Sequence, residues 1–227
     1  MSRKRIVVLL SGNGSTLQAL IDHQPDAHYE IIAVFSNRPD AYGLKRAASA
    51  NIPNHIIDHN DFAERTAFDQ HLLQVIKPLN PDYVVLAGYM RILTLAFVQY
   101  FSGKLINIHP SLLPKHKGLK TYQSALDSDD NEHGTTVHFV TEELDSGANI
   151  LQASLPINAA DTIESLEQRV KAMEKKIYPL ALDWLSSGRI STKNSKVCLD
   201  NQPLPKQGYS VQEENLDRQC QRLLIKP

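Results

Sequence analysis

The stretch Ile6–Thr16, with the sequence IVVLLSGNGST, decides the fold class of this 227-residue chain. Its first five residues form a short apolar run, which is typical of a strand that is buried on both faces. Serine and glycine end that run, and Ser15–His23 then follows a helical pattern. A strand that leads through a glycine loop into a helix predicts the first unit of a parallel α/β sheet.

The same alternation continues through the first half of the chain. Further short apolar runs predict strands at Ile31–Phe35, Tyr83–Ala87 and Leu105–Ile108. The helical patterns Tyr42–Asn51 and Asp61–Ile76 lie between them. Because the crossovers of parallel strands have a fixed hand, this order predicts an α/β fold with a Rossmann-like, mostly parallel central sheet flanked by helices.

The second half predicts a mixed or antiparallel C-terminal portion. The runs Gly134–Val140 and Ile150–Leu155 predict two strands joined by an irregular loop. Beyond Ser186 the chain is polar and rich in turn residues, so we expect a hairpin and a trailing arm. Within that arm, Val211–Ile225 predicts a short peripheral helix.

A long helix is expected between those two parts. It should begin near Asp161, because Asp161 and Glu164 have the spacing of an N-terminal capping pair. Pro179 is expected to end or kink it, since proline lacks the amide hydrogen that a helix interior needs.

Composition argues against several classes of function. The 24 Lys and Arg residues balance 25 Asp and Glu residues, so no field favours a nucleic-acid partner. No stretch is long enough to cross a bilayer, and no membrane association is expected. Cys198 and Cys220 form no C-x-x-C pair, which indicates a reduced, cytoplasmic chain. The nine histidines contain no H-E-x-x-H motif, so no metal dependence is expected.

The glycine loop Ser11–Thr16 is the first candidate site. Glycine allows close approach of the backbone to an anion, and the N-terminus of the following helix can hold a phosphate. The loop is neither a complete G-x-G-x-x-G nor a Walker motif, so one phosphate is a more natural ligand than a dinucleotide. The loop alone is equally compatible with a tight turn in which Ser15 or Thr16 caps the helix. Its place beyond the carboxyl end of a strand favours a ligand.

The second candidate site is carried by Leu105–Pro114. Residues two apart in a strand face the same side, so Asn107 and His109 are expected to point into one site. An amide donor beside an imidazole can stabilise an oxyanion and move a proton. Asp145 is a candidate third member, since a carboxylate favours and orients an imidazolium. The residues alone leave open a structural histidine and an aspartate in an ordinary turn.

Five motifs, in order and at comparable spacing, give the chain a resemblance to a known family: Ser11–Ser15, Ala87–Leu93, Asn107–Pro114, His133–Val140 and Leu144–Gly147. On these motifs it is similar to the folate-dependent phosphoribosylglycinamide formyltransferases, over about residues 5 to 210. The resemblance implies an enzyme of purine biosynthesis. Such an enzyme transfers the formyl group of its co-substrate, 10-formyltetrahydrofolate, to the amine of glycinamide ribonucleotide, and it uses no metal.

The resemblance also implies roles for individual residues. The catalytic group would stabilise the tetrahedral oxyanion that forms when the amine attacks directly, without a covalent enzyme intermediate: Asn107, His109 and Asp145. The ribonucleotide phosphate would be held by Gly14, Ser15 and Thr16, and its ribose and glycinamide portion by Glu174. The folate-binding positions would be Arg65, Met90, Arg91, Ile92, Leu93, Asn107, Val140, Thr141, Glu142, Glu143 and Leu144. Met90, Ile92 and Leu93 have an alternative as ordinary core residues.

The resemblance further implies the organisation of the chain. We expect a single formyltransferase domain with a phosphate-binding half over about 1–100, a catalytic and folate-binding half over about 101–210, and an extension at 211–227. A monomer or homodimer that binds only small molecules is expected. Three features depart from the family pattern. The loop Lys115–Lys120 is unusually basic, and we expect it to be a solvated loop. Lys171 stands where a polar, often amide, side chain is usual in the family. The tail after Gly208 lies outside the resemblance.

Four rival functions make different demands on the sequence. A methionyl-tRNA formyltransferase would need a further nucleic-acid-binding domain, and a formyltetrahydrofolate hydrolase usually carries an N-terminal regulatory domain. An NAD-dependent oxidoreductase would need an acidic residue at the end of the second strand, where this chain has Ser36–Arg38. A non-catalytic nucleotide-binding module would leave the convergence of Asn107, His109 and Asp145 without a purpose. The hydrolase and the binding module remain the alternatives.

Overall fold

The computed structural model describes residues 2–193 and 196–224, and it divides into two compact units. The first unit comprises the chain up to Asn107 together with Val140–Glu142. The second comprises Ile108–Phe139 and the chain from Glu143 onward.

The first unit alternates strands and helices as the sequence predicts. Its elements are β1 Lys4–Leu10, α1 Ser15–His23, β2 Tyr29–Ser36, α2 Tyr42–Ser49, β3 Asn54–Ile56, α3 Arg65–Ile76, β4 Tyr83–Leu86, α4 Leu95–Tyr100 and the start of β5 Leu105–His109, with 3-10 turns η1 Gln24–Asp26, η2 His59–Asp61 and η3 Lys77–Leu79. The predicted bounds of α1 are confirmed. The predicted start of α3 at Asp61 is wrong, because a separate 3-10 turn capped by Asp58 occupies His59–Asp61.

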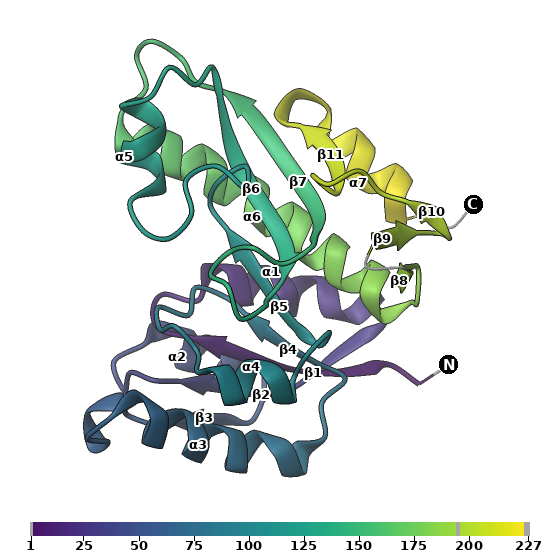
Figure 1. Ribbon diagram of the computed structural model, residues 1–227. Helices are drawn as coiled ribbons and strands as arrows, with labels where there is room; N and C mark the ends of the chain where they lie inside the picture. The colour runs from purple at the N-terminus through teal and green to yellow at the C-terminus, as the bar shows by residue number, and fades with distance from the viewer. Residues whose placement is uncertain (1, 194–195, 225–227) are drawn as a thin grey trace. The chain divides into compact units, whose positions relative to one another are not determined.

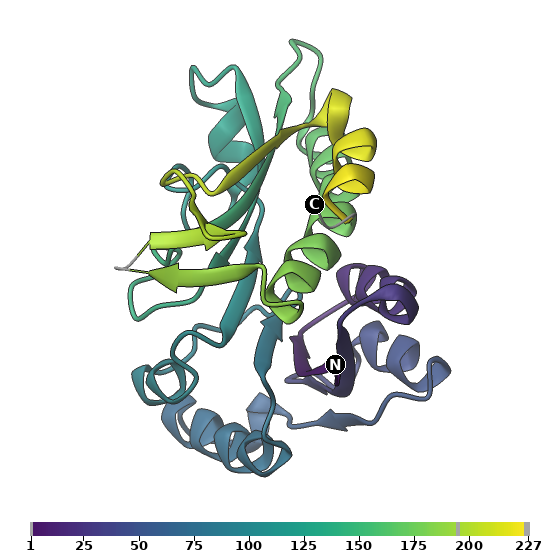
Figure 2. The same cartoon turned by 90° about the vertical axis from the view of Figure 1, so that its right-hand side faces the viewer.

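The strands of the first unit form a parallel sheet in the order β5-β4-β1-β2-β3. Helices α1 and α2 cover one face, and α3 and α4 cover the other (Figures 1 and 2). On the α3 side, Leu9, Phe35, Phe68 and Phe97 belong to one hydrophobic cluster. A sheet covered on both faces explains the almost continuous apolar runs from which the strands were predicted.

The second unit carries the mixed portion. Its elements are α5 Thr121–Leu126, β6 Glu132–Phe139, β7 Asn149–Pro156, α6 Ile163–Ser186, β8 Ile190–Lys193, β9 Lys196–Leu199, β10 Gln202–Pro203, β11 Tyr209–Gln212, η4 Glu213–Asn215 and α7 Leu216–Leu224. Strand β7 pairs antiparallel with β6 and parallel with β11, and β10-β9-β8 form a small antiparallel sheet. The predicted fold class, a mostly parallel sheet flanked by helices with a mixed C-terminal portion, is confirmed.

Two details of the long helix differ from the prediction. The N-terminal cap is Thr162, which exchanges hydrogen bonds with Ser165 in a capping box, and not the pair Asp161 and Glu164. Pro179 does not end the helix, which continues to Ser186. Because every residue of Ile177–Ser186 is buried, packing compensates for the hydrogen bond that proline removes.

The C-terminal arm is more ordered than its sequence indicates. Asp200 and Asn201, both at positive φ, form the turn of the predicted hairpin. Beyond it β11 extends the sheet beside β7, and α7 packs along α6 (Figure 2). The prediction of one helix over Val211–Ile225 is wrong at its start, which is a strand, and Ile225 lies outside the described residues. Among the described residues, no helix is long and apolar enough to span a membrane.

Candidate functional site

The imidazole of His109 is buried at the end of β5, in the second unit. Its Nδ1 lies 3.5 Å from Oδ2 of Asp145, and its Nε2 lies 2.9 Å from the backbone carbonyl oxygen of His116. Both ring nitrogens thus face oxygen acceptors. An imidazolium, which carries a proton on each nitrogen, satisfies both of them. The structure brings together His109 and Asp145, as the sequence predicts.

Asp145 is held by its backbone conformation and by one backbone donor, and it lies beside His138. It lies at a φ of 48°, in the left-handed region. The backbone N–H of Gly118 donates to its Oδ2 at 2.9 Å. On the other side, Nε2 of His138 lies 3.8 Å from its Oδ1. A carboxylate with a fixed backbone and a backbone donor is a stable orienting group for the His109 ring.

His138 is a site residue that sequence reasoning missed. Its Nδ1 lies 2.9 Å from the carbonyl oxygen of Phe139, to which it donates. Burial lowers the pKa of His138 to about 4, so the ring is neutral near pH 7 and its Nε2 carries no proton. The only signal was its place in the motif His133–Val140, and nothing in that pattern indicated contact with Asp145.

Asn107 lies in β5, two residues before His109, and it is partly buried. The chain passes from the first unit into the second directly after it. Because alternate residues of a strand face the same side, the strand presents both side chains on one face. That is the relationship from which this pair was predicted.

The basic loop is exposed at its three lysines, as expected of a solvated loop, but His116 is half-buried. Asp130 forms ion pairs with Lys115 and with His116, whose Nε2 lies 2.8 Å from Asp130 Oδ2. Hydrogen bonds from Lys115 and His116 lower the pKa of Asp130 to about 2. The loop therefore arrives at His109 and Asp145 with its backbone anchored, whereas Leu119 is exposed. The peptide bond between Leu113 and Pro114 is cis.

Glu174, on α6, is a buried carboxyl in the second unit. The hydroxyl of Thr135 donates to its Oε1 at 3.4 Å and to the carbonyl oxygen of His109 at 3.0 Å. Burial raises the pKa of Glu174 to about 7. In the same unit, burial lowers the pKa of His133 to about 4, and its buried Nε2 has no hydrogen-bond partner among the described residues. Two titratable groups with pKa values shifted this far are typical of a functional site.

The glycine loop has the backbone geometry of an anion site. Gly14 lies at a φ of 73°, and a Cβ there would stand 2.5 Å from Cα of Gly43. No side chain caps α1, so the alternative in which Ser15 or Thr16 caps this helix is wrong. Its first amides are therefore available to an anion. Arg46 holds the loop by donating to the backbone carbonyl and to the side-chain oxygen of Asn13.

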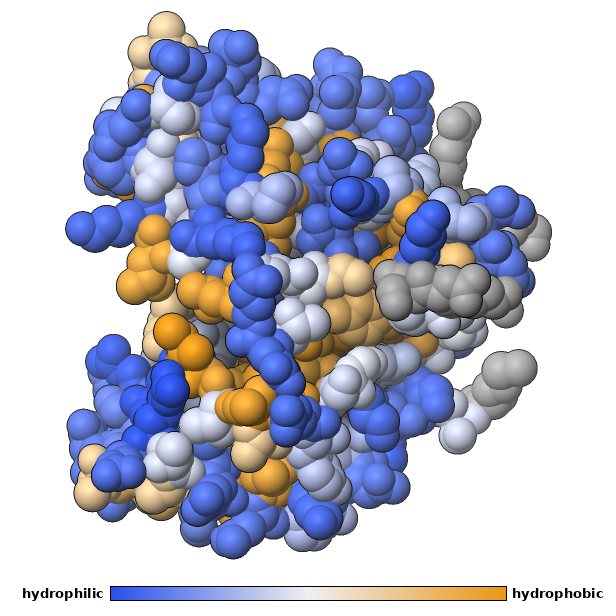
Figure 3. Space-filling model, viewed as in Figure 1, coloured by the Kyte–Doolittle hydropathy of each residue, from blue (hydrophilic) through white to orange (hydrophobic). Residues whose placement is uncertain are grey.

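The folate-binding candidates of the first unit lie on loops and at the start of a helix. Met90 and Ile92 are 71% and 58% exposed, so the core alternative is wrong for both. Leu93 and Val140 pack against the hydrophobic cluster. The remaining members are Arg65 at the start of α3, Arg91 with its guanidinium over the Phe68 ring, and the exposed Thr141 and Glu142. On the face shown in Figure 3, apolar side chains reach the surface among hydrophilic ones.

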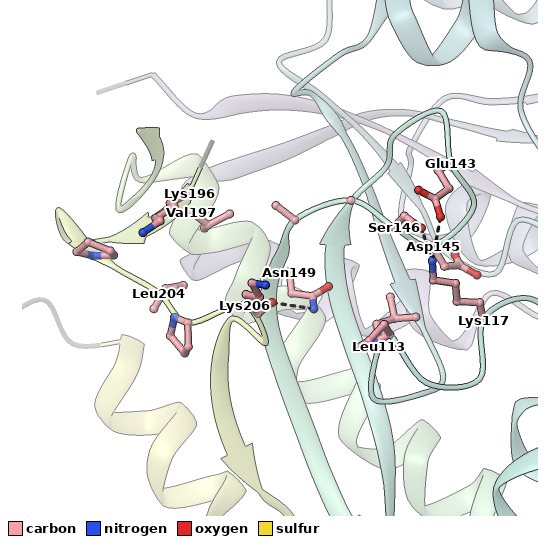
Figure 4. Close-up of a pocket in the computed structure, with 15 residues that line it drawn as sticks. Leu113, Lys117, Glu143, Asp145, Ser146, Asn149, Lys196, Val197, Leu204 and Lys206 are labelled. Carbon is pink, nitrogen blue, oxygen red and sulfur yellow. Dashed lines mark hydrogen bonds and ion pairs between the residues drawn. The ribbon is translucent and has the colours of Figure 1, made fainter. Parts of the chain in front are cut away.

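The other two candidates, Glu143 and Leu144, are exposed residues of the second unit. Glu143 lines a pocket of about 640 Å³ that also includes Asp145 and Lys117. Figure 4 shows these three side chains grouped together, with the Lys117 ammonium 3.3 Å from the Glu143 carboxylate. The C-terminal arm supplies further lining residues of this pocket, among them Leu204 and Lys206.

Among residues 2–193 and 196–224, no group of three or more histidine, cysteine, aspartate or glutamate side chains is arranged to hold a metal ion. His55 and His59 have a spacing of four residues, but they lie in β3 and in the 3-10 turn η2 and not on one helix.

The chain is similar to known proteins over most of its length. The model of the formyl transferase family matches residues 4–182. The chain is 49% identical to a phosphoribosylglycinamide formyltransferase of Haemophilus influenzae, over 91% of this chain and 99% of that one. It is 50% identical to that of Escherichia coli, over 92% and 99%. A solved structure of such an enzyme from Coxiella burnetii is similar at 51% identity with a TM-score of 0.87, over 92% of this chain and 99% of that one.

Proposed function

The chain belongs to the formyl transferase family and, within it, to the phosphoribosylglycinamide formyltransferases, and from this premise we propose that it moves the formyl group of 10-formyltetrahydrofolate to the amine of glycinamide ribonucleotide. The reaction would supply a step of purine biosynthesis in the cytoplasm. The single observation that carries the proposal is the pair His109 and Asp145, in which a buried imidazole faces a fixed carboxylate at 3.5 Å.

The reaction begins when the neutral amine of the ribonucleotide attacks the formyl carbon. The new C–N bond converts the formyl oxygen into an oxyanion. When the tetrahedral intermediate collapses, the bond to N10 of the folate breaks, the amine nitrogen loses a proton and N10 gains one. Formylated ribonucleotide and tetrahydrofolate leave, and no bond to the protein forms at any stage.

His109 and Asn107 stabilise the oxyanion in this mechanism. The Nε2–H of His109 donates to the His116 carbonyl in the structure. In the reaction the oxyanion, which is a stronger acceptor, accepts this hydrogen bond instead. The Asn107 amide donates from the same side of β5. Asp145 keeps the imidazolium oriented, and its contact with the Gly118 amide keeps Asp145 itself in position. The ring and its carboxylate are buried, which strengthens both interactions.

The ribonucleotide binds in this proposal through its two ends. The amides at the start of α1, over Gly14, Ser15 and Thr16, bind the phosphate, and the positive end of the helix dipole adds to the attraction. Glu174 contacts the ribose and glycinamide portion, and its pKa of about 7 lets it act as acceptor or donor near neutral pH. Lys171, one turn before Glu174, stands beside that contact.

The folate binds through exposed apolar and main-chain groups. Met90 and Ile92 offer apolar surface to a flat heterocycle. Arg65, Arg91 and Leu93, which belong to the same unit, are the further folate-binding residues in this proposal. Val140, Thr141, Glu142, Glu143 and Leu144 supply backbone groups to the edge of the pterin. The exposure of Thr141, Glu142, Glu143 and Leu144 supports this role, because a side chain that reaches solvent can be covered by a ligand.

A formyltetrahydrofolate hydrolase is the second candidate, since water could replace the amine. We therefore propose to measure tetrahydrofolate release from 10-formyltetrahydrofolate by the purified chain, with and without glycinamide ribonucleotide. Release that needs the ribonucleotide is expected. Equal release without it would support the hydrolase, and no release in either mixture would favour a binding module that only shares the fold.

The native mass of the same sample would show whether the enzyme is a monomer or a homodimer.

A further inference from the structure

Ser11 is the buried residue from which the glycine loop starts, directly after β1. Its backbone N–H donates to the carbonyl oxygen of Gly88 at 3.1 Å. Its hydroxyl accepts the backbone N–H of Met90 at 2.8 Å and donates to Oδ1 of Asn37 at 2.6 Å. One serine thus joins the segments that follow β1, β2 and β4, all within the first unit.

The partner of this hydroxyl is itself fixed. Asn37 is 4% exposed, and Nδ1 of His59 lies 2.8 Å from its backbone carbonyl oxygen, to which it donates. The side-chain amide nitrogen of Asn37 lies 3.4 Å from the same ring nitrogen. The end of the second strand, where a dinucleotide-binding protein carries an acidic residue, is therefore used here to hold Ser11 in one orientation.

The two segments tied by Ser11 are the ones assigned to the two substrates. The residues Gly12–Thr16 that follow it form the proposed phosphate loop. Met90 begins the proposed folate stretch and is 71% exposed. Gly12 and Asn13 in the first segment and Ile92 in the second are also exposed, so a ligand can cover each segment. Ser11 contacts both segments, and a shift of one segment on its ligand can therefore reach the other through this hydroxyl.

We propose that Ser11 is a positioning residue that couples the two substrate sites, so that binding of the ribonucleotide raises the affinity for the folate and the reverse. The inference rests on the proposed function, which assigns a ligand to each segment. Its physical basis is that a buried hydroxyl which loses one partner leaves a polar group unsatisfied, so both contacts tend to form together. Thermodynamic linkage requires the effect to be equal in both directions.

The test is calorimetric binding of glycinamide ribonucleotide, alone and at saturating 5,8-dideazafolate, a folate analogue that has no formyl group to transfer. In the wild-type chain the analogue is expected to tighten ribonucleotide binding at least about fivefold, which is the lower end of typical coupling between sites. In Ser11→Ala the ratio of the two dissociation constants should fall to about one. The measurement repeated with the order of the ligands reversed should give the same ratio.

Ser36→Ala is the matched control. Ser36 is equally buried, at the end of the neighbouring strand β2, but its hydroxyl contacts only the backbone of Arg38 among the interactions that the structure describes. This variant should keep the wild-type ratio. If Ser11→Ala does not fold, Ser11→Cys takes its place and should lower the ratio, because a thiol is a weaker hydrogen-bonding group.

The outcomes separate this inference from the proposed function. If the wild-type chain binds neither ligand, the proposed function falls and the inference falls with it. If it binds both but the ratio is one, or if Ser11→Ala keeps the wild-type ratio, only the inference is overturned. A ratio lost equally in Ser36→Ala would also overturn it, since the effect would then belong to any buried serine of the sheet.

Discussion

The Nδ1 atom of His109 faces Oδ2 of Asp145 at 3.5 Å, and the Gly118 amide holds that same oxygen at 2.9 Å. The carboxylate is thus presented to the imidazole by the backbone, in a region that solvent hardly reaches. The proposed mechanism depends on the charge at this position and not only on its hydrogen-bonding capacity.

Asp145→Asn tests that dependence. The amide oxygen still accepts from Gly118, but the negative charge beside the imidazolium is lost. We expect kcat to fall at least about a hundredfold with little change in either KM, because oriented charge acts on the transition state. Glu132→Gln, an exposed neutralisation in the same unit at a residue with no assigned role, should keep kcat within about twofold. Steady-state kinetics of both variants makes the comparison, and near-wild-type turnover in Asp145→Asn would remove Asp145 from the mechanism.

Ser15→Asp separates a phosphate site from an ordinary helix start. A carboxylate in the first turn of α1 interacts favourably with the helix dipole, so the melting temperature should not fall. The same charge repels a phosphate, and KM for the ribonucleotide should rise at least about tenfold. Ser102→Asp adds the same charge at an exposed position of the first unit and should leave KM unchanged. An unchanged KM in Ser15→Asp would assign the loop a different task.

Gly14→Ala should destabilise the first unit. A methyl group there requires a left-handed backbone at a φ of 73° and stands 2.5 Å from Cα of Gly43. Strain and overlap together should lower the free energy of unfolding by about 2 kcal/mol or more. Gly12→Ala is the control, because nothing lies within 4 Å of its added methyl group, and its effect should stay within about 0.5 kcal/mol. Urea unfolding of the two variants measures both free energies. Equal stability would mean that α1 and α2 do not approach this closely.

Glu174→Gln should change how stability depends on pH. The pKa of about 7 lies above the ordinary value of 4.5, so the folded chain holds an extra proton between those values. Stability from this group therefore falls as pH rises from about 4.5 to about 7, by on the order of 3 kcal/mol. Glutamine removes that fall while it still accepts from Thr135.

The stability of Glu174→Gln has to be compared with that of the wild type at each pH. The lowered pKa values of His133 and His138 make both proteins more stable as pH rises towards 6.5, which is opposite to the effect of Glu174. Unfolding free energies of wild type and Glu174→Gln at pH 5 and pH 8 give that difference. A difference that does not change between the two pH values would mean that Glu174 titrates as an exposed carboxyl does.

How far the sequence predicts this molecule depends on how local each signal is. The sequence predicts β1 and α1 well, from the run Ile6–Leu10 and the pattern Ser15–His23. Both signals, a continuous apolar run and a helical periodicity, come from consecutive residues. Pro179 misleads for the opposite reason. Its local preference is overridden by the burial of Ile177–Ser186, which belongs to the packing of the whole second unit.

The site residues also divide into those predicted from neighbouring positions and those found only through tertiary contacts. Asn107 and His109 are two residues apart in one strand, so their common face can be predicted from spacing alone. Ser11 contacts Met90, which lies 79 residues further along the chain. His138 contacts Asp145, and the carbonyl of His116 contacts His109, across seven residues each. These contacts follow no helical or strand periodicity, so the sequence pattern does not predict them. For the same reason the strand β11 could not be found, since it exists only through its pairing with β7.

The most direct test of the central claim is a single turnover with 10-formyltetrahydrofolate that carries carbon-13 in its formyl group, mixed with excess enzyme and glycinamide ribonucleotide. Mass spectrometry then follows the label in the folate, the ribonucleotide, free formate and the protein. The account predicts that label enters the ribonucleotide at the rate at which it leaves the folate, and that the mass of the protein stays constant. Label that appears in formate, or on the protein before it reaches the ribonucleotide, would contradict direct transfer to the amine.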